Sequence, residues 1–198
     1  MKLRLTAMIL LSLCLSQAFA DEGMWLLGNL RKNKQAERVM KELGLQMPVN
    51  KLYNPKKPAL ANAVVSFGGF CSGVVVSEDG LVFTNHHCGF SAIQSHSSVE
   101  HDYLADGFWA YKMEDELTNP GVTASILERM EDVTDRIAPF LKDDMSEMDR
   151  SAIIDSISAV IVKEAVAGTK LSGQVQPMFE GNQFFLFLYT IYKDVRLV

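Results

Sequence analysis

Thr84-Asn85-His86-His87-Cys88-Gly89 is the stretch of sequence that decides the fold, and it follows Gly68-Gly69-Phe70-Cys71-Ser72-Gly73 at close range. Three short β-rich runs surround these residues, at 63–67, 71–76 and 81–84, and Gly68-Gly69 and the turn 77–80 separate them. Short strands divided by turn residues at this spacing predict an antiparallel hairpin or a β-barrel.

The histidine pair is the part of this stretch that can carry chemistry. A histidine placed directly before a cysteine, at the end of a strand and with another cysteine on the preceding strand, suits a serine-peptidase barrel. Its pKa lies near working pH, so it can take a proton and return it. We predict that residues 85–89 form a loop, in which neighbouring side chains point to opposite sides. Only one of His86 and His87 can then face a cleft, and the pattern Thr84-x-x-His87-Cys88 favours His87 as the catalytic residue.

The first twenty residues have the organisation of a signal peptide. Lys2 and Arg4 precede an apolar run at 7–15, and Ala18-Phe19-Ala20 is a small-x-small cleavage pattern. We predict cleavage after Ala20, with an uncleaved anchor helix as the alternative, and no membrane span after signal removal. The chain is acidic, with a formal net charge of −5, which argues against a nucleic-acid partner.

The cysteines indicate the compartment. Cys14 leaves with the signal peptide, so Cys71 and Cys88 remain as an even pair. In an exported protein such a pair predicts one disulfide, with two buried thiols as the alternative. We therefore expect an exported protein, periplasmic or at the cell surface or secreted.

Hydrophobic spacing predicts the remaining elements. The predicted helices are Met24–Leu43, 131–141 and 146–167, with a linker at 48–58. The last helix should bury Ile153, Ile154, Ile157, Val160 and Ile161. Further strands are expected at 122–127, 172–179 and 184–192. The predicted fold class is therefore mainly β with helices.

The longer sequence context resembles the S46 family of dipeptidyl peptidases, which are exported serine exopeptidases. The matching residues extend over essentially all of 21–198, and Phe70 and Ser72-Gly73-Val74 are local departures from the family pattern. The matching segments are Asp21-Glu22-Gly23-Met24-Trp25, Leu52-Tyr53-Asn54-Pro55, Ala63-Val64-Val65, Thr84–Gly89, Ile93–Leu104, Gly107-Phe108-Trp109-Ala110, Glu131-Asp132-Val133-Thr134 and Asp194-Val195-Arg196-Leu197-Val198.

The resemblance implies a chymotrypsin-like double β-barrel enzyme of which residues 21–198 form only the N-terminal portion. Family members place their triad aspartate and serine beyond the position of Val198, so only His87 is carried over as catalytic. The expected activity is release of dipeptides from peptides with free N-termini, without a cofactor or metal, by a protein that forms a homodimer at full length. The 198-residue chain itself is expected to be inactive.

Three other hypotheses stay open at this point. His86, His87, Cys88, His96, Glu100 and His101 cluster in the sequence and could form a zinc site, although their spacing matches no common metal motif. A non-catalytic exported binding module would need no serine. A trypsin-like endopeptidase would share the fold but cleave inside peptides.

Overall fold

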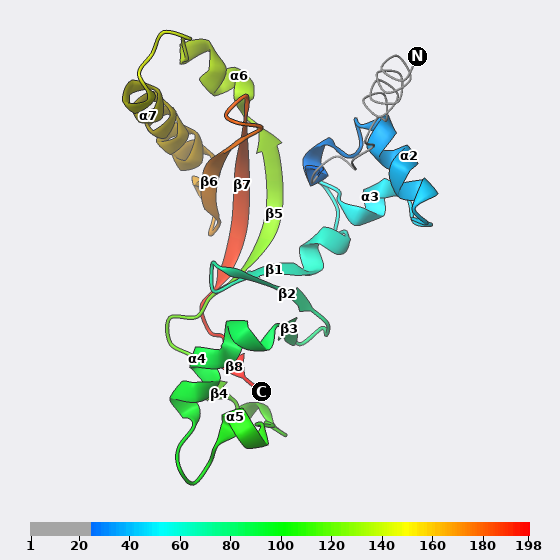
Figure 1. Cartoon of the computed structure of the whole chain (residues 1–198), viewed down its shortest axis with the longest axis vertical. Coiled ribbons are helices and arrows are strands. Elements are labelled where there is room, and N and C mark those ends of the chain that lie inside the picture. The colour runs from blue at the N-terminus through cyan, green and yellow to red at the C-terminus, as the bar shows by residue number, and fades with distance from the viewer. Residues whose placement is uncertain (1–24) are drawn as a thin grey trace, which may run out of the picture.

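The computed structural model describes residues 25–198 (Figure 1), so the predicted signal peptide lies outside the described residues. Six antiparallel strands form one sheet in the order β3-β2-β1-β5-β7-β6, and β4 pairs with β8 in a second, two-stranded sheet. Among these residues β3 and β6 are the edges of the larger sheet. The strands are β1 (Val64–Phe67), β2 (Cys71–Val75), β3 (Val82–Thr84), β4 (Leu117–Thr118), β5 (Ala124–Asp132), β6 (Ser172–Met178), β7 (Gln183–Tyr192) and β8 (Arg196–Leu197).

The helices occupy three places around this sheet (Figure 1). α7 and α6 lie beside β6 and β7, α2 and α3 lie on the opposite side, and α4 and α5 gather near β4 and β8. The α-helices are α2 (Lys34–Glu42), α3 (Val49–Leu52), α4 (His86–His96), α5 (Tyr103–Asp106), α6 (Thr134–Ile137) and α7 (Glu147–Val166). Four 3₁₀ turns accompany them, η1 (Leu27–Asn29), η2 (Leu60–Ala63), η3 (Met113–Asp115) and η4 (Ala138–Phe140).

Strand β7 supplies the core on both faces of the sheet. Its five residues from Phe184 to Leu188 are all buried. Because successive side chains of a strand point to opposite faces, Phe184, Leu186 and Leu188 pack with Ile137 and Ile161 on the helix-covered face. Phe185 and Phe187 pack with Tyr53 and Met130 on the other face. The continuous apolar run in the sequence is thus explained by burial on two sides.

Helix α7 closely matches the helix predicted at 146–167. Ser146 caps it by accepting a hydrogen bond from the Asp149 backbone N–H at 3.1 Å. Gly173 on β6 lets the helix approach, since a Cβ there would lie 3.2 Å from Val162 Cγ1. The predicted buried face is wrong at Val160, which is 51% exposed, whereas the neighbouring Ile161 is 1% exposed. The face of α7 that packs on the sheet is therefore narrower than the set of apolar residues in its sequence.

The single N-terminal helix predicted from Met24 to Leu43 is wrong. The chain forms η1 and then a separate α2, because Asn33 begins a new helix by accepting a hydrogen bond from the Ala36 N–H at 2.9 Å. An asparagine side chain that competes for backbone groups favours a helix start over a helix interior.

The linker predicted at 48–58 also contains ordered core structure. α3 lies within it, and both Val49 and Tyr53 are buried. The Tyr53 hydroxyl accepts a hydrogen bond from the Met130 N–H of β5 at 3.1 Å. The proline and asparagine residues of this segment therefore mark turns on either side of α3, which packs against the rest of the chain.

The helix predicted at 131–141 begins as strand. Glu131 and Asp132 continue β5, opposite Leu186 and Phe185 of β7, and α6 and η4 follow as short turns. Asp132 Oδ1 accepts hydrogen bonds from both the backbone N–H and the hydroxyl of Thr134, at 3.0 and 2.6 Å. This carboxylate turns the chain out of the sheet. No helix within residues 25–198 has the length and apolarity that crossing a membrane requires.

The contrast between Ile161 and Val160 gives a test of the core. Ile161→Ala should lower the free energy of unfolding by about 2–5 kcal/mol, because it leaves a cavity beneath β7. Val160→Ala, the matched change on the exposed side of the same helix, should stay within about 0.5 kcal/mol. Urea denaturation of the purified variants measures both, and equal losses would contradict this assignment of the buried face.

Candidate functional site

The segment that carries the histidine pair is helical, so the loop predicted at 85–89 is wrong. α4 starts directly after Asn85 and continues to His96. His, Cys, Gly and Ser are weak helix formers, and the side chain of Asn85 makes no capping hydrogen bond. Local sequence therefore gives little signal for this helix. Contacts from elsewhere in the chain hold it in place.

The N-terminal end of α4 is tied to the sheet by a disulfide. Cys71, the first residue of β2, is bonded to Cys88 in the first turn of α4, with their Cα atoms 6.1 Å apart, which confirms the predicted pairing. The Thr84 hydroxyl donates a hydrogen bond to the Ser72 carbonyl at 2.9 Å. The chain is thus held to β2 on both sides of the histidine pair.

The C-terminal end of α4 is held by a residue that the sequence did not point to. His96 Nε2 lies 3.0 Å from Asn119 Oδ1, and because an amide oxygen only accepts, Nε2 must carry the proton. Asn119 is 8% exposed, and its backbone N–H donates to the Val195 carbonyl at 3.0 Å. Asn119 therefore joins α4 to the segment that leads into β8.

Strand β8 pairs with β4, and its Arg196 makes exposed ion pairs beside Val195. Arg196 donates two hydrogen bonds to Asp194, at 2.9 and 2.6 Å, and lies 3.6 Å from Glu116. The hydrogen bond from the Arg196 guanidinium holds the pKa of the Asp194 carboxyl below its usual range. This carboxylate is exposed, so the pair contributes little to stability.

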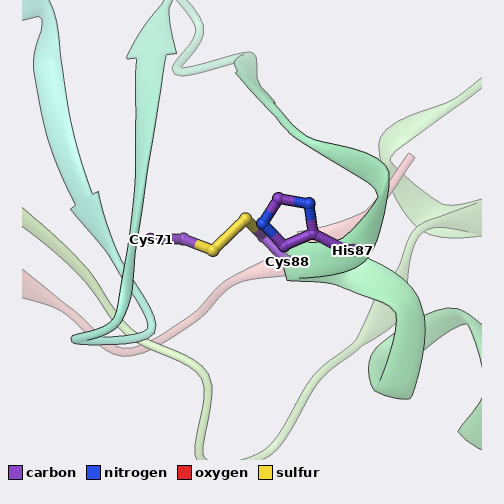
Figure 2. Close-up of side chains that lie close together, drawn as sticks. All are labelled: Cys71, His87 and Cys88. Atoms are coloured by element: carbon purple, nitrogen blue, oxygen red, sulfur yellow. A yellow bond between two sulfur atoms is a disulfide. The ribbon is translucent and has the colours of Figure 1, made fainter.

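Helical geometry separates the environments of the two histidines. Neighbouring residues of a helix lie roughly 100° apart rather than on opposite sides, so the alternation expected for a loop does not apply. His86 packs edge-on against Phe90, with ring centroids 5.8 Å apart. His87 lies beside the Cys71–Cys88 disulfide, as Figure 2 shows. Both imidazoles are exposed.

The structure disperses the histidine-rich cluster that suggested a zinc site. His96 bonds to Asn119, and His101 stacks on Tyr103. Within residues 25–198, the metal-ligating side chains that converge are Cys71, His87 and Cys88, whose ligand atoms lie within 4.8 Å of one another. Both cysteine sulfurs are committed to the disulfide, so in this form the group offers a metal only one imidazole.

Two hollows lie on this part of the molecule, and His87 lines neither of them. A shallow groove of about 390 Å³, lined in part by Ser72, Thr84 and Asn85, borders the segment leading into α4. A larger cavity of about 630 Å³ lies between the N-terminal helices and the sheet, with a mostly apolar lining that includes Trp25 and Leu127. Neither lining contains an acidic, basic or histidine side chain, so the acid–base chemistry of this region comes from the exposed imidazoles at the start of α4.

Comparison with known proteins identifies the family to which this chain belongs. A sequence profile described as Peptidase S46 matches residues 20–198. The chain belongs to the peptidase S46 family.

Two dipeptidyl-peptidases match nearly all of this chain. Dipeptidyl-peptidase 7 of Porphyromonas endodontalis is 46% identical over 96% of this chain and 24% of its own length. The Asp/Glu-specific dipeptidyl-peptidase of the same organism is 40% identical over 96% of this chain and 27% of its own length. The chain therefore spans about a quarter of the length of the curated relatives it matches.

Solved structures show the same fold. The crystal structure of Porphyromonas endodontalis DPP11 matches with a TM-score of 0.73 and 37% identity, over 90% of this chain and 26% of that one. DPP11 in complex with substrate matches with a TM-score of 0.74 and 38% identity, again over 90% and 26% of the two chains. The predicted fold class, mainly β with helices as part of a larger enzyme, is confirmed, and the large sheet is antiparallel.

The Asn119 contact gives a test of how α4 is held. Asn119→Ala should lower the free energy of unfolding by about 1–2 kcal/mol, because it removes a buried hydrogen-bond partner. It should also speed amide hydrogen exchange at residues 93–97, the C-terminal turn of α4. Asn50→Ala, at an exposed position of α3, is the control. Unchanged exchange at 93–97 in Asn119→Ala would show that this contact does not hold the helix.

Proposed function

We propose that this chain supplies the general base, His87, of an exported serine-type dipeptidyl peptidase. The observation that carries the proposal is the position of His87 at the start of α4, next to a disulfide that ties that helix to β2. A general base must be held to a fraction of an ångström, and the disulfide and the Thr84–Ser72 hydrogen bond supply such anchoring.

In the proposed reaction, a serine hydroxyl attacks the carbonyl of the second peptide bond of the substrate. His87 takes the hydroxyl proton and delivers it to the leaving amine, and water then releases the dipeptide from the acyl-enzyme with the same histidine as base. An aspartate orients the imidazole. The serine and the aspartate of this proposal belong to parts of the protein beyond residues 1–198.

Several findings support a dipeptide-releasing activity. The relatives that match over most of this chain are named dipeptidyl-peptidases, and DPP11 has been solved in complex with the dipeptides Arg-Glu and Arg-Asp. The substrates proposed here are therefore peptides with a free N-terminus. We include export through the predicted signal peptide and a homodimeric full-length protein in the same proposal.

Ser72 is the alternative nucleophile within this chain. It lies on β2, one residue from Cys71, and its carbonyl accepts the hydrogen bond from Thr84. Among residues 25–198, His96 is the histidine whose ring makes a hydrogen bond to another residue. Ser72 and His87 are therefore not hydrogen-bonded to each other. A polar strand residue is the better description of Ser72.

The histidine assignment is tested in the full-length protein with a fluorogenic dipeptidyl substrate. His87→Ala should lower kcat/KM by at least about 10³-fold, because the serine loses its base. His86→Ala, the matched change one residue away, should keep measurable activity. Equal losses from the two variants, with normal folding, would contradict the assignment.

Substrate class is tested by blocking the N-terminus. The full-length protein should release dipeptides from free peptides and fail on their N-acetylated forms, whereas residues 1–198 alone should release none. Internal cleavage of the blocked peptides would indicate a trypsin-like endopeptidase instead. Absence of hydrolysis by a folded full-length protein would favour a binding module.

A further inference from the structure

The side chains of Cys71, His87 and Cys88 form a compact group of three nitrogen and sulfur donors (Figure 2). Their ligand atoms lie within 4.8 Å of one another, although Cys71 comes from β2 and the other two from the first turn of α4. In the oxidised chain the two sulfurs are bonded to each other. Reduction would turn the same group into two thiols and an imidazole that lie close together.

We propose that the reduced form of this chain binds one zinc ion through Cys71, Cys88 and a ring nitrogen of His87, with water as the fourth ligand. Zinc binds sulfur at about 2.3 Å and imidazole nitrogen at about 2.0–2.1 Å in a tetrahedral arrangement. The ligand atoms of such a site are therefore roughly 3.3–3.8 Å apart. The observed spacing within 4.8 Å reaches this geometry by side-chain rotation.

The backbone is arranged to keep the three ligands together after the sulfur–sulfur bond is broken. β2 is paired with both β1 and β3, and the Thr84 hydroxyl donates to the Ser72 carbonyl; none of these contacts involves a cysteine sulfur. At the other end of α4, the His96–Asn119 hydrogen bond is likewise independent of the disulfide. The Cα atoms of the two cysteines, 6.1 Å apart, are close enough for both sulfurs to reach one ion.

The chemistry balances with a dithiol as the reductant. The dithiol gives two electrons and two protons to the disulfide, becomes a cyclic disulfide, and leaves two cysteine thiols. Zinc then displaces both thiol protons into solvent, and His87 binds as the neutral imidazole. Two thiolates neutralise the charge of the ion. Zinc affinity should accordingly rise with pH as the thiols lose their protons.

Zinc in this position would inhibit the proposed peptidase reaction. This consequence rests on the proposed function. An imidazole nitrogen bound to zinc cannot accept a proton from a serine, and an ion beside His87 blocks approach to it. The reduced, zinc-bound protein would therefore be silent. An external disulfide that takes two electrons from the two thiolates, and becomes two thiols with protons from solvent, would restore the Cys71–Cys88 bond, release the ion and free His87. Peptidase activity would then depend on oxidation, which is the state expected after export.

The first experiment measures zinc directly and needs no substrate. Purified protein is reduced with a phosphine, which is oxidised to its oxide with oxygen from water and, unlike a dithiol, adds no thiol ligands for zinc. Zinc is then titrated against a chromogenic chelator. The reduced protein should bind one ion per chain, at least about 100-fold more tightly than the oxidised protein.

Variants separate a formed site from two loose thiols. His87→Ala should weaken zinc binding by the reduced protein at least about tenfold, while His86→Ala, which alters the adjacent imidazole, should leave it unchanged. Both variants keep the disulfide pair and can be purified oxidised. Cobalt in place of zinc should give thiolate charge-transfer absorption in the reduced protein that changes on His87→Ala and not on His86→Ala.

The proposal is overturned if the reduced protein binds no stoichiometric zinc, or if His87→Ala and His86→Ala bind it equally. Activity is measured separately in the full-length protein, with zinc added before and after reduction. Stoichiometric binding through His87 without loss of peptidase activity would sustain the metal site and contradict the role of His87 as base. The two proposals therefore fail by different results.

Discussion

Burial of β7 on both faces is the constraint on which the rest of the structure depends. Phe184, Leu186 and Leu188 need a helix layer on one side, and Phe185 and Phe187 need a second layer on the other. α7 provides the first layer, and Tyr53 with the N-terminal helices provides the second. With β7 fixed, β5 pairs along its length and carries β1, β2 and β3 in turn.

The candidate site lies at the far end of this series of strands, where the core no longer determines position. β3 is an edge strand among the described residues, and α4 follows it with little helix propensity of its own. Covalent and polar contacts take over there, namely the Cys71–Cys88 disulfide and the His96–Asn119 hydrogen bond. An exposed imidazole is thereby held on a rigid helix, which suits a residue that must meet a reacting group repeatedly in the same geometry.

Sequence predicted those features that depend on local pattern. The strands around Cys71 and β7, the helix α7 and the disulfide all follow from alternation, periodicity and cysteine count, and the structure confirms them. Features fixed by distant contacts were missed. α4 is held by residues outside its own segment. Asn119, for example, bonds to His96 of α4 and to Val195, which are both distant from it in the sequence. Asn33 and Asp132 redirect the backbone with single side-chain hydrogen bonds that a periodicity argument does not weigh.

The central claim is that His87 activates a serine located elsewhere in the full-length protein. The rate of covalent labelling by a fluorophosphonate measures that activation directly, because the serine oxygen attacks phosphorus and displaces fluoride readily only where a base removes the hydroxyl proton. The account predicts labelling of one serine outside residues 1–198, at a rate that falls sharply in His87→Ala and is retained in His86→Ala. Labelling of Ser72, or an unchanged rate in His87→Ala, would contradict it.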